Sequence, residues 1–142
     1  MDENDSNSAS RELLPVFAAK TDRRRLTGAA VKAVLRIARA WCCSDDEGAA
    51  LLAVSVSTWE RMKAGDWADV LGQDQLTRAS AIVGIYKALH RLFADDMADR
   101  WPRLANSGSV FQGAAPIRTM IGGDVAQMIV VRRQLDAMAQ GV

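Results

Sequence analysis

Residues 48–65 read GAALLAVSVSTWERMKAG, a pattern typical of two short helices joined by a tight turn. Ala49 is the small residue expected where the two helices cross, because a steep crossing leaves little room between them. Ser55 stands where the N-cap of the second helix is expected, and Gly65 stands where that helix would stop. The apolar positions that would fix the crossing angle are Leu51, Leu52, Val54, Trp59 and Met62. The stretch therefore predicts a helix-turn-helix.

The second helix of this unit, expected from Val56 to Ala64, would project polar side chains outward. Hydroxyl and guanidinium groups in such a place suit phosphate oxygens and base edges in a DNA major groove. The residues predicted to bind DNA are Ser55, Val56, Ser57, Glu60, Arg61 and Lys63. The turn position often filled by Gly is Ala53, which would cost on the order of 1 kcal/mol in a left-handed conformation. A hairpin that serves only for packing is the alternative.

Charge is unevenly distributed around the predicted helix-turn-helix. Residues 11–40 carry eight Lys and Arg against two acids, a net of +6, whereas residues 41–66 carry two cations against five acids, a net of −3. Among these acids, Asp45, Asp46 and Glu47 lie beside the expected DNA contact. The whole chain has a net charge of only +1, which argues against a general polyanion-binding protein. Any DNA contact must therefore be local.

The segment before this unit predicts a helix from Thr27 to Trp41 that carries two stripes. Its core-facing stripe consists of Val31, Val34, Leu35 and Ala38. Its basic stripe consists of Lys32, Arg36 and Arg39. After this helix, Ser44 and Glu47 predict a capping box that opens the first helix of the helix-turn-helix.

The start of the chain is polar. Residues 1–10, MDENDSNSAS, have a low-complexity composition that predicts disorder. Arg23, Arg24 and Arg25 could form an arm that touches DNA phosphates or a solvated charge cluster, and the sequence leaves both interpretations open.

The second half of the chain is also expected to be helical. The predicted elements are helices over residues 75–93, 95–101, 116–121 and 124–139, with a loop over residues 103–115. Asp95 or Asp96 is expected to cap the second of these helices, and Pro102 to end it. Pro116 is well placed as a first helical residue, and Asp124 as the N-cap of the last helix. Gly122-Gly123 would interrupt the helical structure between these two helices, and Gly141 would end the last helix.

These patterns predict an all-α fold with three parts. They are a flexible segment over residues 1–20, a helix-turn-helix domain over residues 21–72 and a C-terminal helical module over residues 73–142. The apolar seam of the long helix consists of Ile82, Tyr86, Leu89 and Phe93. Such a seam must be covered, which predicts either a homodimer formed through it or packing against helices of the same chain.

No catalytic or metal-binding motif emerges from the remaining residues. His90 and the adjacent Cys42 and Cys43 provide too few ligands for a metal site, and no nucleophile motif or phosphate-binding loop occurs. We therefore expect no cofactor and no enzymatic activity. No apolar run approaches the ~20 residues needed to cross a bilayer, and the acidic start is unlike a signal peptide. These features predict a cytoplasmic protein without membrane contact.

The chain resembles the Xre/MbcA/ParS antitoxin family in three successive stretches, ALLAVSVSTWERMKAG, RASAIVGIYKALHRLFADDMADRWPRLAN and VFQGAAPIRTMIGGDVAQMIVVRRQLDAMAQG. The resemblance covers residues 27–142. Its most specific features lie in the third stretch, at Phe111, Gly113, Pro116, Gly122-Gly123 and Arg132-Arg133. The resemblance implies an Xre-like helix-turn-helix that represses its own operon by binding operator DNA, followed by a C-terminal toxin-binding module.

The partner implied by this resemblance is a RES-domain toxin that consumes NAD or transfers ADP-ribose from it. The antitoxin would block the NAD cleft of that toxin with C-terminal residues, and it would contain no catalytic residue. The residues implied in toxin binding are Phe111, Pro116, Asp124, Ile129, Arg132 and Arg133. Arg side chains suit sites built for phosphates, and Val130, Leu135 and Met138 would add apolar area.

Three other interpretations remain open. The chain could be a stand-alone transcriptional regulator with a helical dimerisation module. It could be an adaptor whose hairpin never meets DNA. The last helix could also serve only to close the core of the chain, with both Arg132 and Arg133 in solvent.

Overall fold

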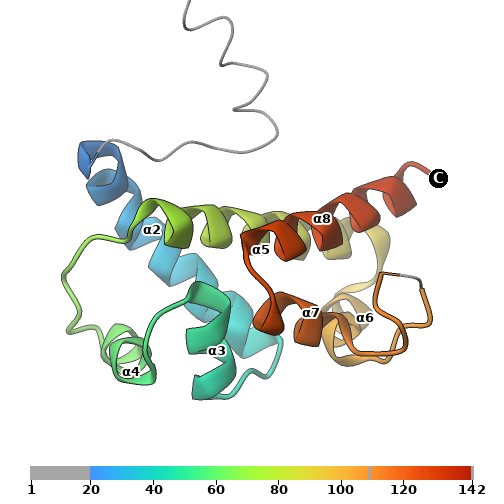
Figure 1. Cartoon of the computed structure of the whole chain (residues 1–142), viewed down its shortest axis with the longest axis horizontal. Coiled ribbons are helices and arrows are strands. Elements are labelled where there is room, and N and C mark those ends of the chain that lie inside the picture. Colours follow the sequence, from blue (N-terminus) through green and yellow to red (C-terminus); the bar gives the residue numbers. More distant parts are fainter. Residues whose placement is uncertain (1–19, 109, 142) are drawn as a thin grey trace, which may run out of the picture.

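The computed structural model describes residues 20–108 and 110–141, and every regular element in these ranges is a helix (Figure 1). The elements are α2 (Lys20–Ala40), α3 (Asp45–Leu52), α4 (Val56–Ala64), α5 (Gln73–Leu92), α6 (Asp95–Arg100), the 3-10 helix η1 (Trp101–Arg103), α7 (Pro116–Gly122) and α8 (Val125–Ala139). The predicted all-α fold is confirmed. The expectation of disorder over residues 1–10 lies outside the described residues. None of the helices in the described ranges is both long enough and apolar enough to cross a bilayer.

Helix α5 is the central element of the molecule. It packs against α2 on one side and against α8 on another, and Figure 1 shows α8 running along it. Helices α3 and α4 lie toward one end of α5, whereas α6 and α7 lie toward the other. The predicted boundary at residues 72–73 therefore coincides with the start of a helix that both halves of the chain share.

The apolar seam of α5 is covered within the chain. Ile82 and Leu89 are 0% exposed, and Tyr86 and Phe93 are half-buried against the same core. Intramolecular packing therefore buries Ile82 and Leu89, as the second interpretation predicts, and a homodimer stays a prediction. Helices α2 and α8, which both pack against α5, contribute to the covering surface.

The predicted starts of α2, α5 and α6 differ from the observed ones. Helix α2 already includes Lys20, the first residue of the described range and seven residues before the predicted start at Thr27, because Arg and Leu in the intervening turns favour a helix even without an apolar stripe. Helix α5 begins at Gln73, two residues before its predicted start. Ala94, and neither Asp95 nor Asp96, is the N-cap of α6. Asp95 instead pairs with His90, Nδ1 to Oδ1, at 2.9 Å.

The C-terminal module is held together by an anchored loop. Phe111 is buried and packs edge-to-face on Trp101, with 5.7 Å between the ring centroids. The backbone amide of Asn106 donates to the carbonyl of Ala114 at 3.1 Å, so the loop closes on itself. Pro102 lies within η1 and does not end α6 as predicted, whereas Pro116 opens α7 as predicted.

Candidate nucleic-acid interface and C-terminal surface

The caps of the helix-turn-helix are formed by local hydrogen bonds. The Ser44 amide donates to Oε1 of Glu47 at 2.9 Å and the Glu47 amide donates to Oγ of Ser44 at 3.2 Å, which confirms the predicted capping box. Oγ of Ser55 accepts from the amide of Thr58 at 3.0 Å and so caps α4. Gly65, at φ 80°, ends α4 as predicted. Both short helices therefore follow from the sequence around them.

The turn between α3 and α4 places Ala53 in the left-handed region, with φ 58° and ψ 47°. This is the conformation in which the sequence predicts a cost for Ala in place of Gly. The Ala53 carbonyl accepts a hydrogen bond from Nε2 of Gln75 at 3.1 Å, and Oε1 of Gln75 accepts from the amide of Gly72 at 2.9 Å. Gln75 thus ties the turn to the start of α5.

The contact that brings α3 and α4 together lies at Gly48. The indole ring of Trp59, only 3% exposed, packs directly over the Cα of Gly48 and leaves no room for a Cβ there. Ala49, the predicted crossing residue, is buried beside this contact. The prediction missed Gly48 because the residue lies inside the first turn of α3, where the sequence signal is dominated by the capping box.

The outer face of α4 is in solvent. All six residues predicted to bind DNA are exposed, namely Ser55, Val56, Ser57, Glu60, Arg61 and Lys63. Two of them already have ionic partners within the chain. Nε of Arg61 lies 3.8 Å from Oδ1 of Asp66, and Nζ of Lys63 lies 2.7 Å from Oδ1 of Asp45. The positive charges of Arg61 and Lys63 are therefore partly compensated by acids of the same chain.

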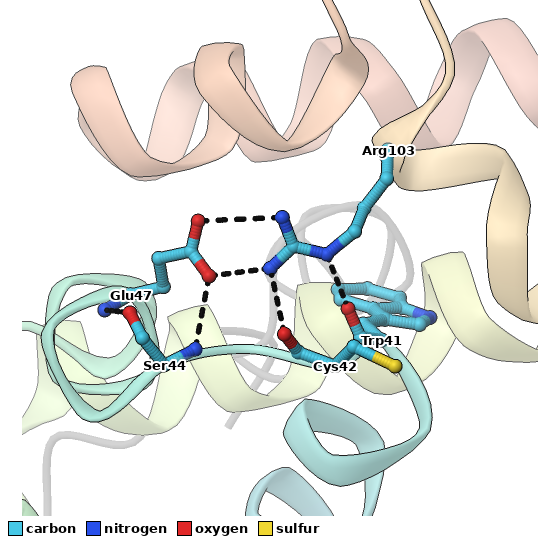
Figure 2. A network of polar contacts seen from close by, with 5 residues as sticks. All are labelled: Trp41, Cys42, Ser44, Glu47 and Arg103. Atoms are coloured by element: carbon cyan, nitrogen blue, oxygen red, sulfur yellow. Dashed lines mark hydrogen bonds and ion pairs between the residues drawn. The ribbon is translucent and has the colours of Figure 1, made fainter.

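Arg103 joins the C-terminal module to the helix-turn-helix, as Figure 2 shows. Its Nε donates to the carbonyl of Trp41 at 2.6 Å, and its Nη2 donates to the carbonyl of Cys42 at 3.0 Å. Its guanidinium also meets both carboxylate oxygens of Glu47, with 3.4 Å between Nη1 and Oε2. One side chain thus links the end of α2, the capping box of α3 and η1.

Two groups at this network have shifted pKa values, each for a different reason. Hydrogen bonds from Arg103 hold the pKa of Glu47 below its usual value. Burial raises the pKa of the Cys43 thiol to about 11, despite the opposing charge of Arg103. Cys43 is therefore a thiol at neutral pH and a poor nucleophile. The contact between Arg103 and Glu47 could not be predicted from the sequence, because Glu47 lies 56 positions earlier in the chain.

Helix α8 has a buried face and an exposed face. Met128, Val131 and Leu135 are 0% exposed and pack into the core, so Leu135 is not available for a partner. Val130 and Met138 are 40% and 38% exposed, and Arg133 is also exposed. Arg133, three positions after Val130, shares a face with it, whereas Met138, five positions after Arg133, points to another side of the helix.

The two neighbouring arginines of α8 differ in their surroundings. Arg132 lies over Gly84 of α5, where a Cβ on Gly84 would lie 2.6 Å from Cζ of Arg132. Its Nε is also 4.0 Å from Oδ2 of Asp136. Arg133 is exposed and, within the described part of the chain, forms no ion pair.

The other residues predicted to bind a partner through the C-terminal module are distributed between core and surface. Phe111 and Pro116 are buried, so they support the loop and α7 from inside. Asp124 is exposed and caps α8, since its Oδ1 accepts from the amide of Ala126 at 3.1 Å. Ile129 is half-buried. On the outward face of α8, Arg133 therefore lies beside Val130, and only Arg133 of these two is among the six predicted residues.

Comparison with known proteins identifies the first half of the chain. Residues 21–84 match the model of the antitoxin Xre-like helix-turn-helix domain. Over 115 residues the chain is 36% identical to y4oB of Sinorhizobium fredii (strain NBRC 101917 / NGR234), which is described as an uncharacterized protein. That alignment covers 80% of this chain and 86% of y4oB. No solved structure matches the chain.

Proposed function

Because this chain belongs to one family with y4oB of Sinorhizobium fredii and carries an antitoxin Xre-like helix-turn-helix domain, we propose that it is the antitoxin of a type II toxin-antitoxin system. Its proposed partner is a RES-domain toxin that consumes NAD or transfers ADP-ribose from it. The antitoxin acts by binding, without catalysis or cofactor, in the cytoplasm.

Neutralisation is assigned to the outer face of α8. The observation that carries this assignment is the exposed pair Val130 and Arg133, three positions apart on a helix whose other face closes the core. An apolar group beside a planar, multi-donor cation is a composition typical of protein interfaces. The Arg133 guanidinium can pair with a carboxylate of the toxin or take the place of a substrate phosphate, and so block the NAD cleft.

Autorepression is assigned to α4. The helix offers Ser57, Glu60 and Val56 to base edges, but its cations are bound to Asp66 and Asp45. We therefore expect weak operator binding by the antitoxin alone and stronger binding by the toxin complex, in which several helix-turn-helix units act together and avidity raises affinity by ~10²-fold or more.

A stand-alone transcriptional regulator is the second candidate, and the exposed α4 is compatible with it. A homodimer also remains part of the proposal, but its interface must lie outside the buried seam of α5. Light scattering of the free protein at micromolar concentration tests the homodimer separately from neutralisation.

The antitoxin proposal is tested by co-expression with the RES-domain toxin expected to be encoded beside this gene. We expect growth and cellular NAD to be maintained by wild type and lost with Arg133→Glu, because a reversed charge cannot enter the same site. Arg36→Glu, an exposed change of equal charge on α2, away from α8, is the matched control and should protect cells.

Two results would contradict the proposal. Cells that die even with wild-type antitoxin would leave only the regulator, and full protection by Arg133→Glu would remove the assignment to α8. Deletion of residues 124–142 is unsuitable for this purpose, because it removes Met128, Val131 and Leu135 from the core.

A further inference from the structure

Helix α2 carries a line of cations on one face. Arg24, Lys32 and Arg39 are separated by eight and seven positions, so they project from the same side of a helix. Arg36 lies four positions after Lys32 and widens the line. At 1.5 Å per residue the line is about 22 Å long. These four residues, Arg24, Lys32, Arg36 and Arg39, are called the α2 basic stripe below.

The side chains of the α2 basic stripe are exposed and lack ion-pair partners within the described residues. All four side chains are exposed, and within residues 20–108 and 110–141 none of them forms an ion pair or a side-chain hydrogen bond. The cations of α4 differ in this respect, since Arg61 and Lys63 are bound to acids. Of these two helices, α2 therefore offers unpaired positive charge to an anionic partner, whereas the cations of α4 are already paired.

The stripe lies next to α4. Lys32 and Arg24 line a groove of about 450 Å³ together with Met62 and Gly65 at the end of α4. Arg39 lines a second hollow of about 220 Å³ together with Lys63 and Trp59 of α4. Leu35 lines both, so the two hollows follow the border between α2 and α4.

We propose that the α2 basic stripe is the surface of this protein that binds DNA phosphates. Helix α4 then contacts the bases and contributes only a small part of the affinity for DNA. A helix in a major groove about 12 Å wide has a sugar-phosphate strand along its side, and the stripe borders α4 where such a strand would run. Duplex DNA carries one charge per about 1.7 Å of axis, so a line of 22 Å spans several phosphates. The inference rests on the proposed DNA binding and is independent of neutralisation by α8.

The test compares two triple variants that remove equal charge. Lys32→Gln, Arg36→Gln and Arg39→Gln together change the stripe, whereas Lys87→Gln, Arg91→Gln and Arg118→Gln change exposed cations of α5 and α7, of which Arg91 lies 3.7 Å from Oδ1 of Asp136. Binding of the full chain, alone and with toxin, is measured by fluorescence anisotropy. The probes are the duplex upstream of its own gene and a scrambled duplex of equal length, over a range of salt concentrations. Circular dichroism checks that each variant folds.

We expect the stripe variant to lose roughly tenfold or more affinity for both duplexes, with a salt slope reduced by about 2–3, while the control keeps wild-type values. Ser57→Ala on α4 should lower only the preference for the native duplex.

The outcomes that overturn the inference are distinct. Unchanged affinity and slope in the stripe variant would overturn it while leaving DNA binding intact. Loss of toxin binding with DNA binding retained would assign the stripe to the toxin. Absence of binding by wild type to either duplex, even with toxin and at low salt, would overturn both the stripe and autorepression.

Discussion

Gly48 is the residue on which the geometry of the helix-turn-helix depends most directly. Because the Trp59 ring packs over its Cα, any side chain there forces the ring or α4 to move. We predict that Gly48→Ala lowers the free energy of unfolding by about 1–3 kcal/mol, as for other insertions into a packed core.

Gly28 provides the matched control for this prediction. It lies inside α2, and a Cβ there would meet nothing within 4 Å. Gly28→Ala should therefore raise the free energy of unfolding by up to about 1 kcal/mol through helix propensity. Urea unfolding of both variants checks the pair. A Gly48→Ala protein as stable as wild type would show that the crossing can relax.

His90 makes the junction of α5 and α6 sensitive to pH. Burial lowers the pKa of its imidazole, but hydrogen bonds to Asp95 and Asp99, each at 2.9 Å, outweigh burial and leave the pKa raised above 6.5. A raised pKa in the folded state means that the protonated ring stabilises the fold below about pH 6.5, and that this contribution is lost as pH rises through the folded pKa.

We therefore predict that stability falls between mildly acidic and mildly alkaline pH by less than about 1 kcal/mol, since Asp95 is largely in solvent. Thermal unfolding at several pH values measures the effect, and His90→Gln should remove this part of it. An identical pH dependence in wild type and His90→Gln would contradict the assignment.

Local residue signals were sufficient for the helix ends near the predicted site. Ser44, Ser55, Gly65 and Asp124 act as predicted because each cap depends on hydrogen bonds or a conformation within a few residues. The contact between Gly48 and Trp59 was not predictable in the same way, because it requires the relative position of two helices.

Helix α8 has a buried face and an exposed face, and its two arginines differ in their exposure and contacts. Arg132→Ala should lower the free energy of unfolding by about 1 kcal/mol, because its guanidinium packs over Gly84. Arg133→Ala should change stability by less than about 0.5 kcal/mol but weaken toxin binding by roughly 2–5 kcal/mol. Calorimetric titration with toxin, together with urea unfolding, distinguishes the two. The assignment fails if Arg132→Ala alone weakens toxin binding.

Helix α5 illustrates what an apolar pattern can and cannot predict. The spacing of Ile82 and Leu89 correctly indicated burial, and the all-round apolar character indicated a central helix. The pattern did not contain the identity of the covering surface. The same apolar residues on α5 are expected whether another copy of the chain or the helices α2 and α8 of the same chain cover them. The sequence therefore could not distinguish these two covering surfaces, whereas the structure shows α2 and α8 packed against α5.

At the level of the whole molecule, Arg103 links the C-terminal module to the helix-turn-helix. We predict that Arg103→Ala lowers the free energy of unfolding by roughly 2–3 kcal/mol, because it removes several hydrogen bonds and leaves the Glu47 carboxylate without its cation. Arg103→Lys should restore part of this loss, since one ammonium cannot reach all three partners.

The same variants test whether the two halves are coupled. If the link positions the helix-turn-helix relative to bound toxin, Arg103→Lys should keep toxin affinity and reduce the gain in operator affinity that toxin gives. Anisotropy with and without toxin measures that gain. A gain equal to that of wild type would show that Arg103 serves stability alone.

The central claim is that this chain neutralises a toxin by occupying its NAD cleft. The most direct measurement follows NAD consumption by the purified RES-domain toxin while full-length antitoxin is added. The account predicts that consumption falls to the level of buffer alone with wild type, that Arg133→Glu needs a large excess to do the same, and that the antitoxin by itself consumes no NAD. Unchanged NAD consumption in the presence of a saturating excess of folded wild-type protein would contradict it.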